Sequence, residues 1–136
     1  MLRGRLLASI LLFLGSPALA ANGIDVKRGD DALVFGNCVP SLVVENKSGE
    51  TIDYLQVELI LALSDGQERK VELQSAYREG ILHPIAPGAR AVLKQHLDTS
   101  RALGVPCGDV AARKVGRILC EAAGGKACTS QVSVQP

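Results

Sequence analysis

Four cysteines are the side chains with the clearest chemical potential in this 136-residue sequence: Cys38, Cys107, Cys120 and Cys128. Protein zinc sites are usually built from pairs of ligands two to four residues apart, and thiol redox sites from a Cys-x-x-Cys motif. Neither spacing occurs here, because seven residues separate even the nearest pair. In an oxidising compartment an even number of cysteines predicts disulfides, and four cysteines allow three connectivities.

Among these connectivities we favour Cys120–Cys128 together with Cys38–Cys107. Gly124-Gly125 lies between the first pair and is a turn signal, so that bridge would clip a hairpin. The second bridge would tie the N-terminal strands to the C-terminal half of the chain. On the loop-entropy model the short loop contributes roughly 2.6 kcal/mol and the long loop roughly 4.4 kcal/mol.

Elsewhere the sequence contains no recognisable catalytic or metal-binding pattern. We interpret the two histidines, His83 and His96, as exposed side chains, because a copper site would need several His, Met or Cys ligands. Asp30 and Asp31 follow Gly29 in a turn-like stretch, where solvated charge is the ordinary interpretation. Serine-nucleophile and zinc-protease motifs do not occur. We therefore predict no catalytic residues, no cofactor and no metal.

Two other motifs have plain interpretations. Asn46-Lys47-Ser48 matches a glycosylation sequon, and we interpret Asn46 as a turn former. Arg113, Lys114 and Arg117 form the densest basic cluster, which is typical of a solvated strand face. A third hypothesis is a hydrolase without a visible motif, which a concave cluster of Asp109, His83 and a serine would support.

The first twenty residues predict the compartment. Arg3 and Arg5 precede an apolar run over residues 6–14, and Ala18-Leu19-Ala20 fits a signal-peptidase site. The run is too short to span a membrane. We expect cleavage after Ala20, which leaves one periplasmic or secreted domain, residues 21–136, without an integral membrane segment.

The charge of this mature domain argues against nucleic acid as a partner. Loss of the two N-terminal arginines lowers the number of Lys and Arg residues from 15 to 13, against 14 Asp and Glu residues, for a net charge of about −1. The aromatic residues beyond residue 20 are Phe35, Tyr54 and Tyr77. The core must therefore be aliphatic, and the scarcity of aromatic rings argues against a sugar-binding cleft lined with stacking rings.

The pattern of the mature sequence is that of a β-protein. Apolar residues occupy every odd position from Leu55 to Leu63, which predicts a strand over residues 52–63 with one buried face. Turn signals at Asn46-Lys47-Ser48-Gly49 and Asp65-Gly66 bracket this strand. Further strands are expected at residues 32–36, 41–45, 70–74, 89–97, 113–120 and 129–134, and single helical turns at residues 75–80 and 99–103. About seven strands predict an all-β, antiparallel, immunoglobulin-like β-sandwich clipped by disulfides.

A family resemblance agrees with this fold. It is carried by Val43-Val44-Glu45-Asn46-Lys47-Ser48-Gly49, by Ile52, Leu55, Val57 and Leu59, by Asp65-Gly66 and by Ile85-Ala86-Pro87-Gly88. With these motifs, residues 40–97 resemble the small bacterial extracellular Ig-like domains of the FxLYD type. The sequence departs from them at Leu63-Ser64, where an aromatic residue normally precedes the Asp. The resemblance implies an Ig-like fold outside the cytoplasm and transfers no functional residue.

A candidate interface lies between the predicted strands. Tyr77, Arg78, Ile81 and Leu82 combine residue types that are frequent in interaction hot spots, although Tyr77 could instead cap an open end of the sandwich. Our leading hypothesis is an exported, non-enzymatic module that binds another envelope or secreted protein. The alternative is a periplasmic protein that binds a small ligand or a metal. The sequence leaves the oligomeric state open.

Overall fold

The computed structural model describes residues 22–75, 77–78, 81–95 and 102–136. The predicted signal peptide, its cleavage site, His96 and most of the helical turn expected at residues 99–103 lie outside these ranges. Within the described residues, no helix has the length and apolar character that crossing a membrane requires.

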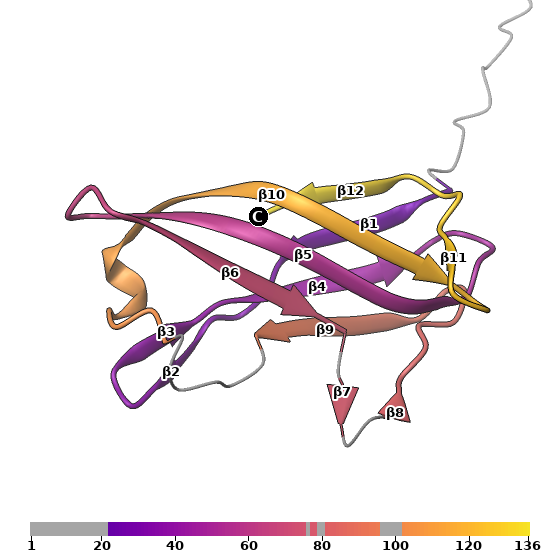
Figure 1. The fold of residues 1–136 in the computed structure, drawn as a ribbon, viewed down its shortest axis with the longest axis horizontal. Coiled ribbons are helices and arrows are strands. Elements are labelled where there is room, and N and C mark those ends of the chain that lie inside the picture. Colours follow the sequence, from indigo (N-terminus) through magenta and orange to yellow (C-terminus); the bar gives the residue numbers. More distant parts are fainter. Residues whose placement is uncertain (1–21, 76, 79–80, 96–101) are drawn as a thin grey trace, which may run out of the picture.

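An eight-stranded sheet forms most of the molecule (Figure 1). Its strands are β1 (Ile24–Arg28), β4 (Ser41–Asn46), β5 (Ile52–Leu63), β6 (Glu68–Gln74), β9 (Arg90–Gln95), β10 (Val110–Ala122), β11 (Lys126–Ala127) and β12 (Val132–Gln135). Two small ladders join β2 (Ala32–Val34) to β3 (Asn37–Val39) and β7 (Tyr77–Arg78) to β8 (Ile81–Leu82). A 3-10 turn at Cys107–Asp109 precedes β10.

The strand predicted from the alternating pattern, β5, has the expected bounds and the expected buried face. All five of its odd-numbered apolar residues from Leu55 to Leu63 are buried. Strand β5 lies between two long antiparallel partners, β6 and β10. The backbone hydrogen-bonding groups on both of its edges are therefore paired. The buried hydrophobic residues are aliphatic apart from one disulfide cysteine, which confirms the expected aliphatic core.

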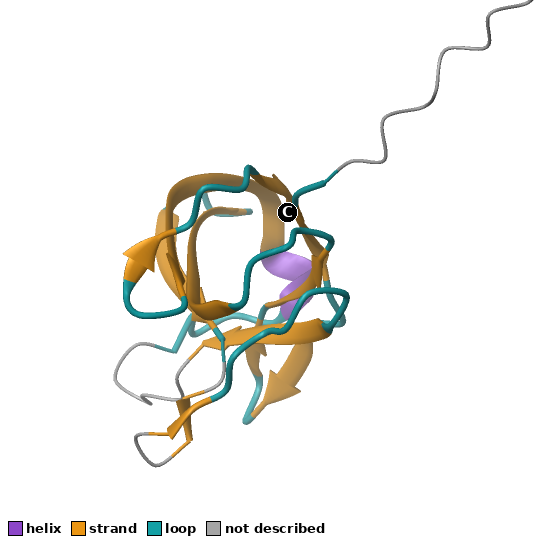
Figure 2. Ribbon diagram, turned by 90° about the vertical axis from the view of Figure 1, so that its right-hand side faces the viewer, coloured by secondary structure: helices purple, strands orange, loops and turns teal. Residues whose placement is uncertain are grey.

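The arrangement of the sheet differs from the predicted antiparallel sandwich. The strand order β11-β10-β5-β6-β9-β4-β1-β12 is continuous, because β6 and β9 are joined by the pairs Leu73–Gln95 and Gln74–Lys94. Viewed from one end, this sheet curls around the core as an open half-barrel (Figure 2). One pairing is also parallel, between the first strand β1 and the last strand β12. The all-β class and the disulfides are confirmed.

Several local predictions need correction. The helical turn expected at residues 75–80 is wrong, since Tyr77–Arg78 is the strand β7 and pairs with β8. The strand expected at residues 32–36 ends at Val34, because the chain turns at Phe35-Gly36 and returns as β3. Strand β1 was missed, since the polar residues in Asp25-Val26-Lys27-Arg28 leave only Ile24 and Val26 to indicate its buried face.

Candidate functional site

The hairpin formed by β2 and β3, residues 32–39, carries the most exposed large apolar side chains of the described chain. We call it the stapled hairpin. Phe35 at its tip is 96% exposed and the neighbouring Leu33 is 63% exposed. In Figure 1 the hairpin extends beyond the large sheet, beside the 3-10 turn. An exposed Phe at a tip is an arrangement that burial does not explain, because its ring packs against no core.

The backbone at this tip is also unusual. Phe35 has φ 48° and Gly36 has φ 78°, so both central residues of the two-residue turn are left-handed. Gly, Asn and Asp favour that conformation, whereas a bulky aromatic residue pays roughly 1–2 kcal/mol for it. The side-chain amide of Asn37 donates a hydrogen bond of 3.2 Å to the Phe35 carbonyl and supports the turn. The sequence signal for this turn is Phe-Gly between two short apolar runs. The strand predicted over residues 32–36 includes Phe35, whereas the structure places Phe35 in the turn.

The base of the stapled hairpin is fixed by a disulfide. Cys38 in β3 is bonded to Cys107 in the 3-10 turn, and the Cys38 amide donates a 2.8 Å hydrogen bond to the Val105 carbonyl. The second disulfide joins Cys120 to Cys128 across the hairpin of β10 and β11. These are the two pairs that the spacing favoured. Disulfides of this kind are typical of proteins outside the reducing cytosol.

A buried ion pair lies behind the same base. The Arg113 guanidinium forms two hydrogen bonds with the Asp31 carboxylate, and these side chains are only 5% and 9% exposed. Arg28 donates a further hydrogen bond of 2.9 Å to Asp31. Burial raises the pKa of Asp31, but the hydrogen bonds from Arg113 and Arg28 outweigh it and lower the pKa below its ordinary value.

This ion pair corrects two interpretations of the sequence. The sequence predicts solvated charge at Asp31 and a solvated basic face at Arg113, yet both side chains are almost fully enclosed. No local pattern could have revealed the pair, because its members are 82 residues apart in the chain. Their effect is to hold the connection between β1 and β2, which leads into the stapled hairpin, against β10.

An apolar groove of about 350 Å³ lies between the stapled hairpin and the outer face of β4 and β9. On the hairpin side it is lined by Ala32, Val34, Val39 and Pro40, and on the sheet side by Val43 and Val92. Val43 and Val92 are direct partners in the β4–β9 ladder and point away from the core, since their neighbours Leu42 and Leu93 are buried. The polar residues around the groove are Asp30, Ser41, Lys94 and Gln95.

The geometry of the described residues offers one group that resembles a metal site, and its chemistry does not fit a metal. Asp31, Cys38 and Cys107 place potential ligand atoms within 4.8 Å of one another. Both sulfur atoms are joined in the disulfide, so neither is a thiolate. The carboxylate is bound by two guanidinium groups. This cluster is therefore a structural brace of the stapled hairpin.

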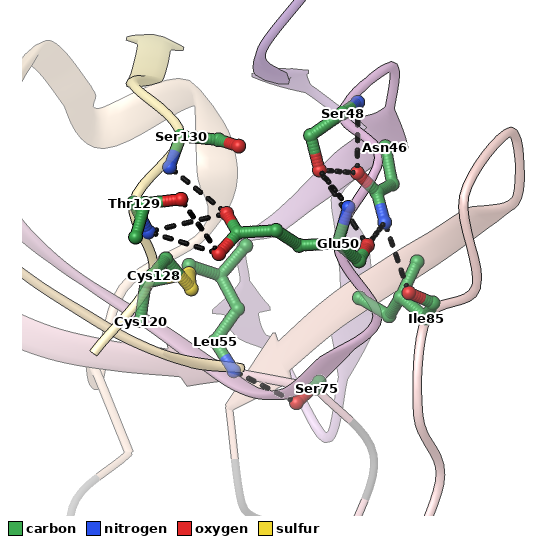
Figure 3. Close-up of a disulfide and its surroundings, with 10 residues drawn as sticks. All are labelled: Asn46, Ser48, Glu50, Leu55, Ser75, Ile85, Cys120, Cys128, Thr129 and Ser130. Carbon is green, nitrogen blue, oxygen red and sulfur yellow. Dashed lines mark hydrogen bonds between the residues drawn. A yellow bond between two sulfur atoms is a disulfide. The ribbon is translucent and has the colours of Figure 1, made fainter. Parts of the chain in front are cut away.

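A second hydrogen-bond network lies beside the Cys120–Cys128 disulfide (Figure 3). The Glu50 carboxylate accepts hydrogen bonds from the backbone amides of Ser130 and Thr129 and from the Thr129 hydroxyl, at 2.8–3.1 Å. These bonds from Ser130 and Thr129 lower the pKa of Glu50 from 4.5 to about 2. We call this arrangement the Glu50 clamp. It ties the β4–β5 connection to the segment between Cys128 and β12, and the sequence contained no signal for it.

Asn46 is occupied within the fold. Its side chain is 1% exposed, donates to the Glu50 and Ile85 carbonyls, and accepts from the Ser48 amide and hydroxyl (Figure 3). Glycosylation of the folded protein at the sequon would require this amide nitrogen to be free. The turn-forming role that the sequence favoured agrees with the observed geometry.

The candidate pair for a hydrolase is separated by the fold. Asp109 lies at one end of β5, where its carbonyl accepts from Ser64, while His83 lies two residues before Ile85, which bridges to Ile52 at the other end. A 12-residue strand spans roughly 35–40 Å, so the two side chains cannot meet. His83 is exposed, as expected.

The four residues of the predicted interface come together in the β7–β8 ladder. Tyr77 pairs with Leu82 and Arg78 pairs with Ile81. In Figure 1 this ladder stands apart from the eight-stranded sheet. Their role as an interface stays a prediction.

Comparison with known proteins places the fold and no activity. No protein-family model and no curated protein matches the sequence. The chain is similar to the solved structure of IrmA from Escherichia coli, with 17% identity and a TM-score of 0.53 over 83% of this chain and 91% of that chain. At this level of identity, the likeness concerns the all-β fold alone.

Proposed function

We propose that this protein is an exported, non-enzymatic interaction module that binds another envelope or secreted protein through the stapled hairpin. The observation that carries the proposal is Phe35, an exposed aromatic residue held in a left-handed conformation. Strained residues persist where the surrounding structure enforces them, and they cluster at functional positions. Large aromatic side chains are also the residues that most often dominate binding energy when a partner pocket encloses them.

The bracing of the hairpin supports this role. The Cys38–Cys107 disulfide and the Asp31–Arg113 ion pair fix its base, while the Phe35 side chain at its tip is 96% exposed. A rigid presentation lowers the entropy that binding would otherwise cost. The partner would offer an apolar pocket for the Phe35 ring, with Leu33 at its margin.

Crosslinking in the cells that make the protein tests the proposal. A photoreactive amino acid at position 35 should give a discrete higher-mass adduct, whereas the same amino acid at position 65, in the exposed β5–β6 turn, should not. Excess unmodified protein should compete with the adduct, and the Phe35→Ser variant should compete poorly. Identical adducts at both positions, or none at position 35, would contradict the proposal.

Export is a separate part of the proposal. Residues 1–20 would act as a cleaved signal peptide, which suits a domain with two disulfides. The intact mass of protein from the periplasm or medium should correspond to residues 21–136 with four cysteines oxidised. Protein retained in the cytosol with an intact leader would contradict export.

For the fold, we propose an Ig-like origin of the curled sheet, of the kind that FxLYD-type domains share. The support is the strand order: β9, β4, β1 and β12 are consecutive neighbours on one side of the β6–β9 pairing, and β6, β5 and β10 on the other. On this interpretation the two β6–β9 pairs are a local junction between two sandwich layers. An experimental structure in which β6 and β9 separate at that junction would support it.

A further inference from the structure

The groove beside the stapled hairpin combines an apolar floor with two unpaired charges. Val43 and Val92 form its sheet side, and Val92 is 43% exposed although it is apolar. Asp30 and Lys94 both border the groove, and among the described residues neither side chain has an ion-pair partner. An apolar surface with a few polar groups at its margin is the usual composition of a small-molecule site.

Asp30 and Lys94 both border the groove where their backbones lie beside Ser41. Ser41 places them there: its hydroxyl donates a 2.7 Å hydrogen bond to the Asp30 carbonyl, and it is the direct ladder partner of Lys94. Val43 and Val92 follow two residues further along the same strands, on the same face. The groove therefore has a charged end that carries both signs and an apolar end.

We propose that this groove binds an apolar α-amino acid. The ammonium group of such a ligand would meet the Asp30 carboxylate, its carboxylate would meet the Lys94 ammonium, and its side chain would cover Val43 and Val92. The volume of about 350 Å³ is at the lower limit of small-molecule sites, which favours an amino acid over a longer chain. A ligand with adjacent opposite charges and an apolar side chain satisfies both ends together.

This binding is independent of the proposed docking of Phe35, which does not line the groove. The Phe35→Ser variant should therefore bind the amino acid as the unaltered protein does. Loss of the crosslinked partner would leave the groove proposal intact, and failure of ligand binding would leave the hairpin proposal intact.

The test is titration of the mature protein with L-leucine. Binding is measured by calorimetry and by changes in amide chemical shifts. We expect saturable one-to-one binding, with the largest shifts at Ser41, Val43, Val92 and Lys94. L-serine, which lacks the apolar side chain, and N-acetyl-L-leucinamide, which lacks both charges, should each bind at least about fivefold more weakly.

Matched variants locate the site. Asp30→Asn and Lys94→Gln should each weaken leucine binding by about fivefold or more, whereas Lys70→Gln, an exposed lysine of β6, should leave it unchanged. Unchanged melting temperatures would show that these surface variants are folded. The proposal is overturned if leucine shows no saturation up to about 20 mM, if N-acetyl-L-leucinamide binds equally well, or if the shifts map elsewhere.

Discussion

Phe35 and Arg113 occupy positions that their residue types do not favour. An aromatic ring stands in solvent on a left-handed backbone, and a guanidinium group is enclosed beneath the hairpin that carries that ring. The first costs stability through its backbone conformation, although the Asn37 side chain supports the turn. The cost of enclosing Arg113 is offset by its hydrogen bonds to the Asp31 carboxylate.

Replacement of Phe35 by Asn should stabilise the isolated domain. Asn tolerates the left-handed region, and Asn-Gly is a favoured pair for this two-residue turn. We expect the free energy of unfolding to rise by about 1 kcal/mol in urea denaturation. Phe35→Ala keeps a Cβ atom and should change it much less, so equal effects of the two substitutions would contradict strain at this position.

Removal of Asp31 should be costly because it leaves Arg113 buried without its partner. Asp31→Ala should lower the free energy of unfolding by about 3 kcal/mol, while Asp30→Ala, an exposed neighbour, should change it by less than about 0.5 kcal/mol. The double variant Asp31→Ala, Arg113→Met should recover much of the loss, as measured by a double-mutant cycle. A similar loss in the double variant would show that the ion pair is not the cause.

At the scale of elements, the sequence predicted what short-range patterns encode. Alternation marked β5 from end to end, and the Gly124-Gly125 turn indicated the Cys120–Cys128 clip. The braces of the candidate site were missed because each joins distant segments: Asp31 to Arg113, and Glu50 to Thr129 and Ser130. The composition of those segments is ordinary, and only the folded chain brings them together.

The Glu50 clamp should make stability depend on acidity. The pKa of the Glu50 carboxyl is about 2 in the folded protein and 4.5 ordinarily, so the ionised carboxylate stabilises the fold above pH 4.5. That contribution is lost as the pH falls from 4.5 towards 2. We expect Glu50→Gln to melt at a lower temperature than the unaltered protein at pH 7, and the difference to shrink over this window. A constant difference from pH 7 to pH 2 would contradict the clamp.

The two disulfides should contribute unequally. The Cys38–Cys107 bridge closes a loop with a sequence separation of 69 residues, and the Cys120–Cys128 bridge one of 8. We expect Cys38→Ser with Cys107→Ser to cost up to about 4.4 kcal/mol, and Cys120→Ser with Cys128→Ser up to about 2.6 kcal/mol. Denaturation of the two double variants under matched conditions gives the order. A larger loss of stability in the Cys120, Cys128 double variant would contradict the loop-entropy model, which treats the denatured chain as an open coil.

At the scale of the whole molecule, the sheet is continuous but unevenly joined. β5 and β10 pair over most of their lengths, whereas β6 and β9 share two residue pairs. The sequence predicted the strands but not the junction between β6 and β9. That junction depends on where the ends of two separately predicted strands lie in space. The junction is therefore where the half-barrel should open most easily.

Hydrogen exchange should detect that uneven joining. Amides at the centre of β5, such as those of Val57 and Leu59, should exchange only through global unfolding. Amides at the end of β9, Lys94 and Gln95, should exchange at least about tenfold faster through local opening. The exchange is monitored by NMR under native conditions. Equal protection of the β5 amides and the β9 amides against exchange would show that the sheet opens as one unit.

The parallel pairing of β1 with β12 has a consequence for how the molecule is made. Ile24 pairs with Val132, which lies 108 residues later in the chain, so the outer edge of β1 stays uncovered until that segment has been synthesised. A chain with such distant partners folds slowly, because the entropy of closing a long loop must be lost before the contacts form. Until then the edge of β1 remains open to other strands. A nascent chain that stops short of β12 should therefore aggregate, which makes late completion of the sheet the vulnerable step in its biogenesis.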